Sequence, residues 1–396
     1  MLSDPDEDGP SSGTMVAMTS SAAPAVVGVP RETKPDEHRV AVTPDGVREL
    51  ARHDVTVVVE AAAGADSGFP DADYAAAGAA VVATADEVWA RADLICKVKE
   101  PQPEEWPRLR AGQALFTYLH LAAYPEVGTA LLEAGVRAIG YETVQLADGT
   151  LPLLAPMSEV AGRLSVQVGA HFLERPNGGS GVLLGGAPGV APARVVVLGA
   201  GNVGWNAAWI AAGMEAEVRL LDLDLDRLRH VDQIHRGRIT TLASNRGSVE
   251  RAVRDADLVI GAVLVAGGRA PVLVDEATVA AMRPGSVIVD VAVDQGGCIA
   301  TTVETSHHDP VRVVHGVLHY GVGNIPAAVP HTSTHALCNA TLPHLVRLAA
   351  AGVEGAIGRH PELLAGCNTW DGAVVHPTVA AALGVEAVPF AEARKR

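Results

Sequence analysis

The segment Arg194 to Gly204, with the sequence RVVVLGAGNVG, constrains the fold more than any other part of the chain. Four aliphatic residues lead into a G-x-G-x-x-G pattern, which is typical of a strand, a tight turn and the start of a helix. Gly199 permits the turn, Gly201 lets the backbone approach a pyrophosphate, and Gly204 lets the helix pack closely on the sheet. The segment therefore predicts a doubly wound sheet that binds a dinucleotide at a helix N-terminus.

Asp222 ends the apolar run EVRLLD, eighteen residues after Gly204. A carboxylate at this distance can accept hydrogen bonds from both hydroxyls of an adenosine ribose, and its charge would repel a 2′-phosphate. We therefore expect NAD rather than NADP as the cofactor. The alternative is an ordinary glycine-rich loop, but the preceding strand, the following helix and the spacing of the acidic residue all favour the dinucleotide site.

Length and charge limit the classes of protein that the chain can represent. Its 396 residues exceed one typical hydrophobic core and predict two domains. A formal net charge of −16 argues against nucleic acid or an anionic membrane as a partner. No apolar run approaches the roughly 18 residues of a membrane-spanning helix. The four cysteines form no C-x-x-C pair, so we expect a reduced, cytoplasmic protein without a zinc site, and we assign no metal.

The order of apolar runs predicts an α/β fold with two doubly wound parallel-sheet domains joined by long helices. Residues 1–24 contain no Lys or Arg and are expected to form a flexible tail. A substrate domain is predicted from 25–152 together with 331–396, and an NAD-binding Rossmann domain from 153–330. A long helix that opens near Pro156, with Ser158 as a plausible N-cap, would carry the chain between them.

Several further segments resemble one known family. They are GVPRETKPDEHRVAVTP (28–44), KVKEP (97–101), FTYLHLAA (116–123), LPLLAPMSEVAGR (151–163), VDQGG (293–297) and TSTHALCNAT (332–341). Together with GAGNVG, this set resembles the family of alanine dehydrogenases and transhydrogenase NAD-binding subunits. The resemblance implies reversible NAD-dependent oxidative deamination of L-alanine to pyruvate and ammonium, carried out by a homohexamer.

Three residues of these segments are the expected substrate-handling groups. The planar guanidinium of Arg39 could hold a substrate carboxylate through two parallel hydrogen bonds, and the resemblance makes it the carboxylate anchor. The resemblance places the second substrate-binding group on Lys99, with Lys97 as the alternative that serves structure alone. His120 ends the apolar run ALFTYLH, and the resemblance makes it the general acid/base. The alternative for Arg39 is a surface arginine with no binding role. The alternative for His120 is a core histidine that only bonds to the backbone.

The resemblance implies further residues on both sides of the reaction. Asp294, rather than Asp290 four residues earlier, would position the ammonia or the attacking water as a second catalytic residue. Met157 would lie near the substrate methyl group, although core packing explains it nearly as well. The remaining expected cofactor contacts are Ser158, Arg227, Ser244, Val263 and Asn324.

Two other functions stay open at this point. The first is hydride transfer between two nucleotides, as in the transhydrogenase subunit, with a membrane partner chain. The combination of Arg39, Lys99 and His120 argues against it, because nucleotide exchange needs no group that holds a small carboxylate. The second is a catalytically silent NAD-binding protein, which would bind NAD without turnover.

Overall fold

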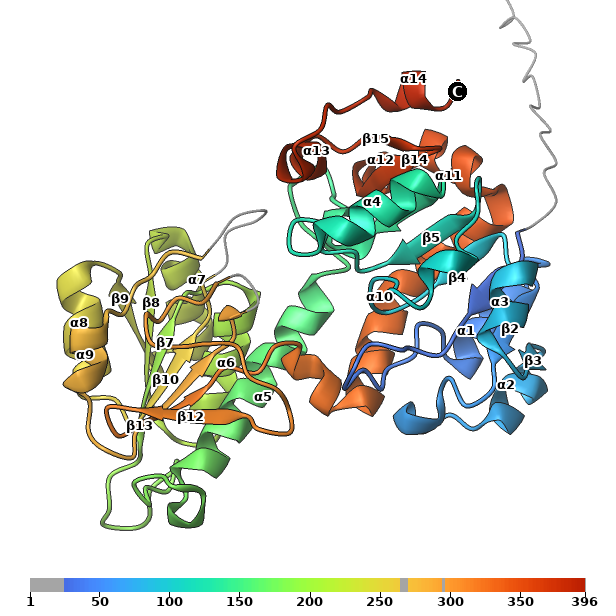
Figure 1. The fold of residues 1–396 in the computed structure, drawn as a ribbon. Helices are drawn as coiled ribbons and strands as arrows, with labels where there is room; N and C mark the ends of the chain where they lie inside the picture. The colour runs from blue at the N-terminus through green and yellow to red at the C-terminus, as the bar shows by residue number, and fades with distance from the viewer. Residues whose placement is uncertain (1–24, 264–269, 294–295, 396) are drawn as a thin grey trace, which may run out of the picture.

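The computed structural model describes residues 25–263, 270–293 and 296–395. They form two α/β lobes, each built on one largely parallel sheet, and the helices α5 and α10 run between the lobes (Figure 1). This confirms the predicted fold class.

The first sheet has eight strands in the order β15-β14-β6-β5-β4-β1-β2-β3. Its parallel strands are β1 (Val27–Val29), β2 (Val57–Glu60), β3 (Ala80–Val82), β4 (Leu94–Cys96), β5 (Ala114–Thr117) and β6 (Arg137–Gly140). The helices between them are α1 (Pro44–Ala51), α2 (Asp71–Ala77), α3 (Ala85–Arg91) and α4 (Pro125–Glu133). Because the strands are parallel, the loops after β1, β4 and β5 all leave from the same edge of the sheet.

The C-terminal segment joins this first sheet through two strands that the all-parallel prediction did not include. Strand β14 (Cys367–Trp370) pairs antiparallel with β6, and β15 (Ala373–Val374) pairs antiparallel with β14. The surrounding helices are α11 (Val353–Arg359), α12 (Pro361–Gly366), α13 (Pro377–Leu383) and α14 (Phe390–Ala393). The chain thus returns to the lobe in which its first strand lies.

The second sheet has the order β12-β13-β11-β10-β7-β8-β9. Its strands are β7 (Arg194–Leu198), β8 (Glu217–Asp222), β9 (Ile239–Ala243), β10 (Leu258–Gly261), β11 (Val287–Asp290), β12 (Val311–Val314) and β13 (Val317–Tyr320). Its helices are α6 (Asn202–Gly213), α7 (Leu225–His235), α8 (Arg246–Arg254) and α9 (Glu276–Ala280). All pairs are parallel except β12 with β13. The strand order reverses between β7 and β10, and open sheets of this kind bind ligands at that point.

Two long helices connect the lobes, α5 (Ala155–Leu173) and α10 (Pro330–Ala351). The predicted N-cap of α5 was wrong, because Leu154 is the N-cap and the amide of Ser158 donates to the Leu154 carbonyl within the first turn. Proline is favoured in the first helical turn, so Pro156 allows the helix to begin earlier than a serine cap would indicate.

Within the described residues, no helix combines the length and apolar character needed to cross a bilayer. The four cysteines are all buried and unpaired. No group of three or more His, Cys, Asp or Glu side chains in the described ranges could hold a metal ion.

Candidate active site

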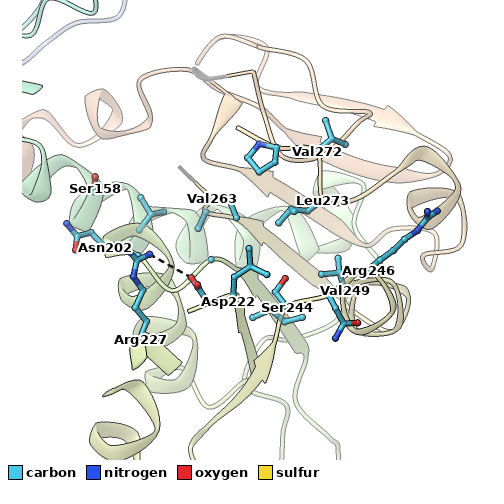
Figure 2. Close-up of a pocket in the computed structure, with 18 of the residues that line it drawn as sticks. Ser158, Asn202, Asp222, Arg227, Ser244, Arg246, Val249, Val263, Val272 and Leu273 are labelled. Atoms are coloured by element: carbon cyan, nitrogen blue, oxygen red, sulfur yellow. Dashed lines mark ion pairs between the residues drawn. The ribbon is translucent and has the colours of Figure 1, made fainter. Parts of the chain in front are cut away.

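A cavity of about 940 Å³ opens at the carboxyl ends of β7, β8 and β10, beside the point where the strand order reverses (Figure 2). Seven of the predicted cofactor residues line it: Ser158, Gly199, Gly201, Asp222, Arg227, Ser244 and Val263. Gly204 and Asn324 are not among the residues that line it. The cavity is large enough for a cofactor and draws its walls from segments that are far apart in the sequence.

The three glycines of the fingerprint meet different constraints. Gly199 has φ +103°, in the region that favours glycine. A Cβ atom on Gly201 would meet no atom within 4 Å, so its backbone stays open to the cavity. A Cβ atom on Gly204 would lie 1.7 Å from the carbonyl oxygen of Gly199, so α6 can pack on β7 only without a side chain there. This arrangement fits a pyrophosphate at the start of α6.

Asp222 lies at the end of β8 and faces the cavity (Figure 2). One carboxylate oxygen accepts the Ala200 amide at 2.5 Å, and the other accepts the Asp224 amide at 2.8 Å. These bonds fix the carboxylate, and each oxygen keeps acceptor capacity for a ribose hydroxyl. The guanidinium of Arg227 stands 4.0 Å from the same carboxylate. The residues present therefore fit the adenosine half of NAD.

Arg39 lies in the loop between β1 and α1 and is 2% exposed. Its Nε and Nη2 donate to the two carboxylate oxygens of Glu37 at 2.6 and 2.5 Å. Nη2 also donates to Oδ1 of Asn324 at 2.8 Å, and Nη1 to the sulfur of Met157 at 2.9 Å. Arg39 and Met157 are thus together, as the prediction required, and Asn324 contacts the predicted substrate anchor.

The two lysines of KVKEP have different environments. Lys97 is fully buried, and its amino group forms ion pairs with Glu32 at 3.1 Å and Glu105 at 2.9 Å. Lys99 is 8% exposed, and within the described part of the chain its amino group has no hydrogen-bond partner. Burial lowers the pKa of Lys99, and the positive charge of Arg39 lowers it further. Lys97 therefore serves the structure, whereas Lys99 has an amino group available to a ligand.

His120 follows β5 by three residues and has φ +48°, which is uncommon for a residue with a side chain and concentrates at functional sites. Its amide donates to Oε1 of Glu142 at 2.6 Å. Its ring stacks on Tyr118 with ring centroids 5.5 Å apart. The turn is therefore held at both the backbone and the ring, and this fixes the direction of the imidazole.

Burial lowers the pKa of His120 well below its usual value, and the charges of Lys99, Lys34 and Arg39 lower it further. Lys34 forms an ion pair with Glu100 at 2.5 Å and lies 4.5 Å from the centre of the Tyr124 ring. Arg39 and Lys34 are each paired with a carboxylate, but the charges of all three cations still favour the neutral imidazole, which can act as a base.

The predicted catalytic residue Asp294 lies outside the described residues. Its competitor Asp290 is buried at the end of β11 and accepts the amides of Ala292, Cys298 and Ile299 at 3.2, 3.0 and 3.2 Å. Asp290 is therefore occupied in holding the backbone after β11.

The fold and the cavity define a two-domain α/β protein of the dinucleotide-binding class. The chain belongs to the alanine dehydrogenase/PNT family: residues 28–161 match its N-terminal domain and residues 165–377 its C-terminal domain. This confirms the family resemblance, the enzyme class of NAD-dependent amino-acid dehydrogenases, and NAD as the cofactor of the family.

Individual relatives agree with this assignment. An alanine dehydrogenase of Mycobacterium tuberculosis (strain ATCC 25618 / H37Rv) is 55% identical over 92% of this chain and 98% of its own length. A solved structure of an L-alanine dehydrogenase is 50% identical, with a TM-score of 0.88, over 90% of this chain and 99% of that one. The transhydrogenase structure from Sinorhizobium meliloti is 27% identical, with a TM-score of 0.76, over 89% and 99%.

Sequence reasoning missed three residues that act on the predicted groups through contacts or charge. Glu37 binds Arg39, Glu142 fixes the backbone of His120, and Lys34 adds a third positive charge near the imidazole. A signal existed only for Glu37, because an acidic residue two positions before Arg39 can fold back on it. Glu142 and Lys34 are far from His120 in the sequence, so only the fold brings them together.

Proposed function

We propose that the chain catalyses the reversible oxidative deamination of L-alanine to pyruvate and ammonium with NAD. The observation that carries this proposal is the convergence of Arg39, Lys99 and His120: the two basic side chains are buried, and their charges act on the imidazole. A small 2-oxo acid offers one carboxylate and one carbonyl oxygen, which match one guanidinium and one amino group.

Each residue has a distinct part in this reaction. Arg39 and Lys99 hold the carboxylate and the carbonyl oxygen, or the amine in the other direction. NAD, when bound, supplies the hydride acceptor. In deamination, neutral His120 accepts a proton from the water that attacks the iminium carbon, and it returns a proton to the departing amine. Asp294 is proposed to position the water or ammonia.

Holding the substrate beside the nicotinamide is the main catalytic contribution that we propose. Two reacting carbons fixed at contact distance avoid an entropic cost of about 7 to 11 kcal/mol. The proposed cofactor contacts are the seven predicted residues that line the cavity, together with Gly204 and Asn324. Gly204 lies in the first turn of α6, and Asn324 accepts a hydrogen bond from Arg39. Met157 would border the substrate methyl group.

The domain division and the assembly are also proposals. We propose a substrate domain of 25–152 with 331–396 and an NAD-binding domain of 153–330, supported by the pairing of β14 with β6. We propose a homohexamer on the basis of family membership, which gives a mass of about 245 kDa, six times 40.8 kDa. Sedimentation equilibrium tests this mass directly.

The decisive experiment follows NADH absorbance in the presence of pyruvate and ammonium, with each component omitted in turn. Oxidation of NADH that requires both substrates is the expected result. Transhydrogenation would instead consume NADH when only an oxidised nucleotide analogue is added. A catalytically silent binder would show NADH binding by calorimetry and no oxidation in either assay.

A further inference from the structure

Most of the hydrogen-bonding capacity of Arg39 is already in use. A guanidinium has five N–H donors, and four of them have partners here. Glu37 takes one complete edge, formed by Nε and Nη2, with both carboxylate oxygens. The side of the fork that remains for a substrate carboxylate is therefore Nη1, together with the Nη2 hydrogen that Asn324 accepts in this structure.

Glu37 is itself fully enclosed, with no exposed side-chain surface. Besides the guanidinium, its oxygens accept the Arg39 amide at 3.1 Å and the side-chain amide of Asn324 at 2.9 Å. Burial alone would raise the pKa of Glu37, but the charge and hydrogen bonds of Arg39 and the Asn324 amide lower it to about 2. The carboxylate is therefore ionised at every pH near neutrality.

The same group of residues joins the two lobes. Glu37 and Arg39 follow β1 in the first lobe, whereas Asn324 follows β13 in the second and has φ +57°. A second contact lies beside it, because the ring of His308 pairs with the Asp36 carboxylate at 3.0 Å. The orientation of the substrate anchor thus depends on a carboxylate from its own loop and on an amide from the cofactor lobe.

We propose that Glu37 is a positioning residue for the substrate carboxylate, because it fixes Arg39 so that Nη1 and one Nη2 hydrogen face the substrate. This inference rests on the proposed function. Glu37 does not touch the substrate and acts only through Arg39 and Asn324. Its loss should therefore weaken the binding of pyruvate and L-alanine while leaving the distant adenosine contacts at Asp222 unaffected.

The test uses the full chain with three variants. Glu37→Gln removes the negative charge and places the N–H group of the new side-chain amide against the N–H donors of Arg39. Glu37→Asp keeps the charge but is one methylene too short for both bonds. Glu49→Gln is the matched control, because Glu49 is partly exposed on α1 and pairs only with Arg52 and His53 among the described residues.

Hydrogen bonds between charged groups contribute about 10- to 100-fold to affinity, so we expect Glu37→Gln, which misplaces Arg39, to raise the pyruvate KM by about that factor. Glu37→Asp should give an intermediate rise, and Glu49→Gln should match the unmodified chain. The NADH KM should change less than the pyruvate KM in each Glu37 variant, because Glu37 reaches the proposed cofactor contacts only through Asn324.

Three outcomes overturn the inference. A purely structural role would lower the folded fraction, and hence the apparent kcat, with both KM values unchanged. Equal increases in the KM of pyruvate and NADH would show general damage to the cleft. If Glu37→Gln does not fold, Glu37→Asp decides, and an unchanged pyruvate KM in that variant contradicts the positioning role. Absence of turnover in the unmodified chain would instead reject the proposed function.

Discussion

The two sides of the candidate active site are built in different ways. The cofactor side is a cavity of about 940 Å³ that depends on backbone features: glycines, a helix N-terminus and one carboxylate held by amides. The substrate side depends on buried side-chain charges, with Arg39 against Glu37 and Lys99 near His120. The glycines and Asp222 of the cofactor side lie in one continuous stretch, residues 194–222, whereas the groups of the substrate side come together only when distant loops meet.

This difference predicts that substitutions on the substrate side lower turnover with little effect on cofactor binding. Substitutions on the cofactor side should instead weaken cofactor binding. The largest effect is expected for His120→Ala, because a general acid/base contributes about 10² to 10⁴ in rate. Turnover of L-alanine should fall by that factor, while the dissociation constant for NADH, measured by fluorescence titration, stays within about twofold. His53→Ala is the control, since that side chain is exposed and pairs only with Glu49 among the described residues. Unchanged turnover in His120→Ala would remove this residue from the mechanism.

On the cofactor side, Gly204→Ala is expected to have the next largest effect. Its Cβ would lie 1.7 Å from a backbone oxygen, which no rotamer can relieve, and overpacking of this kind costs about 1 to 3 kcal/mol. Because α6 must then move away from β7, we expect NADH affinity to fall by about 10- to 100-fold.

Gly213→Ala is the matched control, because it lies in the same helix and a Cβ there would meet no atom within 4 Å. Its NADH affinity, measured by calorimetry, should equal that of the unmodified chain. Equal losses of NADH affinity in both glycine variants would mean that the close contact between Gly204 and the Gly199 carbonyl does not determine the shape of the cofactor site.

Much of this arrangement could be predicted from the sequence, and the reasons are local. Gly199, Gly201 and Asp222 belong to one strand-turn-helix-strand unit whose spacing is set by the geometry of the fold itself. The two lobes followed from apolar runs separated by helical segments. The assignment of Lys99 to the substrate and of His120 to catalysis came from family resemblance and remains a prediction.

Other features could not be predicted, because they depend on tertiary contacts. The burial of Lys97 between Glu32 and Glu105 joins three separate segments, and no short pattern records it. The antiparallel strand β12 pairs with β13 through the turn at His315 and Gly316, both with positive φ. The sequence His-Gly is not among the strongest signals for such a turn, so the hairpin escaped notice.

A smaller effect is expected for Asp222→Ala. Loss of hydrogen bonds from a charged acceptor to ribose hydroxyls should weaken NAD binding by about 10-fold, at about 1.4 kcal/mol. Removal of the negative charge beside Arg227 should also narrow the preference for NAD over NADP. Asp226→Ala is the control, because Asp226 is exposed on α7 and its replacement also removes one negative charge. Undiminished selectivity in Asp222→Ala, measured as the ratio of the two kcat/KM values, would contradict the ribose assignment.

The smallest predicted effect concerns the electrostatic link between the loops on the substrate side. Lys34 lowers the pKa of His120, and in Lys34→Met this contribution is lost and the Glu100 carboxylate loses its ion pair with Lys34. Both changes favour the protonated imidazole, so the pKa of His120 should rise. Deamination requires the neutral base, so the acidic limb of kcat/KM for L-alanine should move to higher pH.

L-Alanine ionises in the same way in assays of the unmodified chain and of Lys34→Met. The difference between the two pH profiles of kcat/KM therefore reports the ionisation of His120. Arg48→Met, which removes an exposed cation from α1, should leave the limb in place. A limb that moves to lower pH in Lys34→Met, or that moves equally in Arg48→Met, would show that the substrate side does not act as one coupled set of charges.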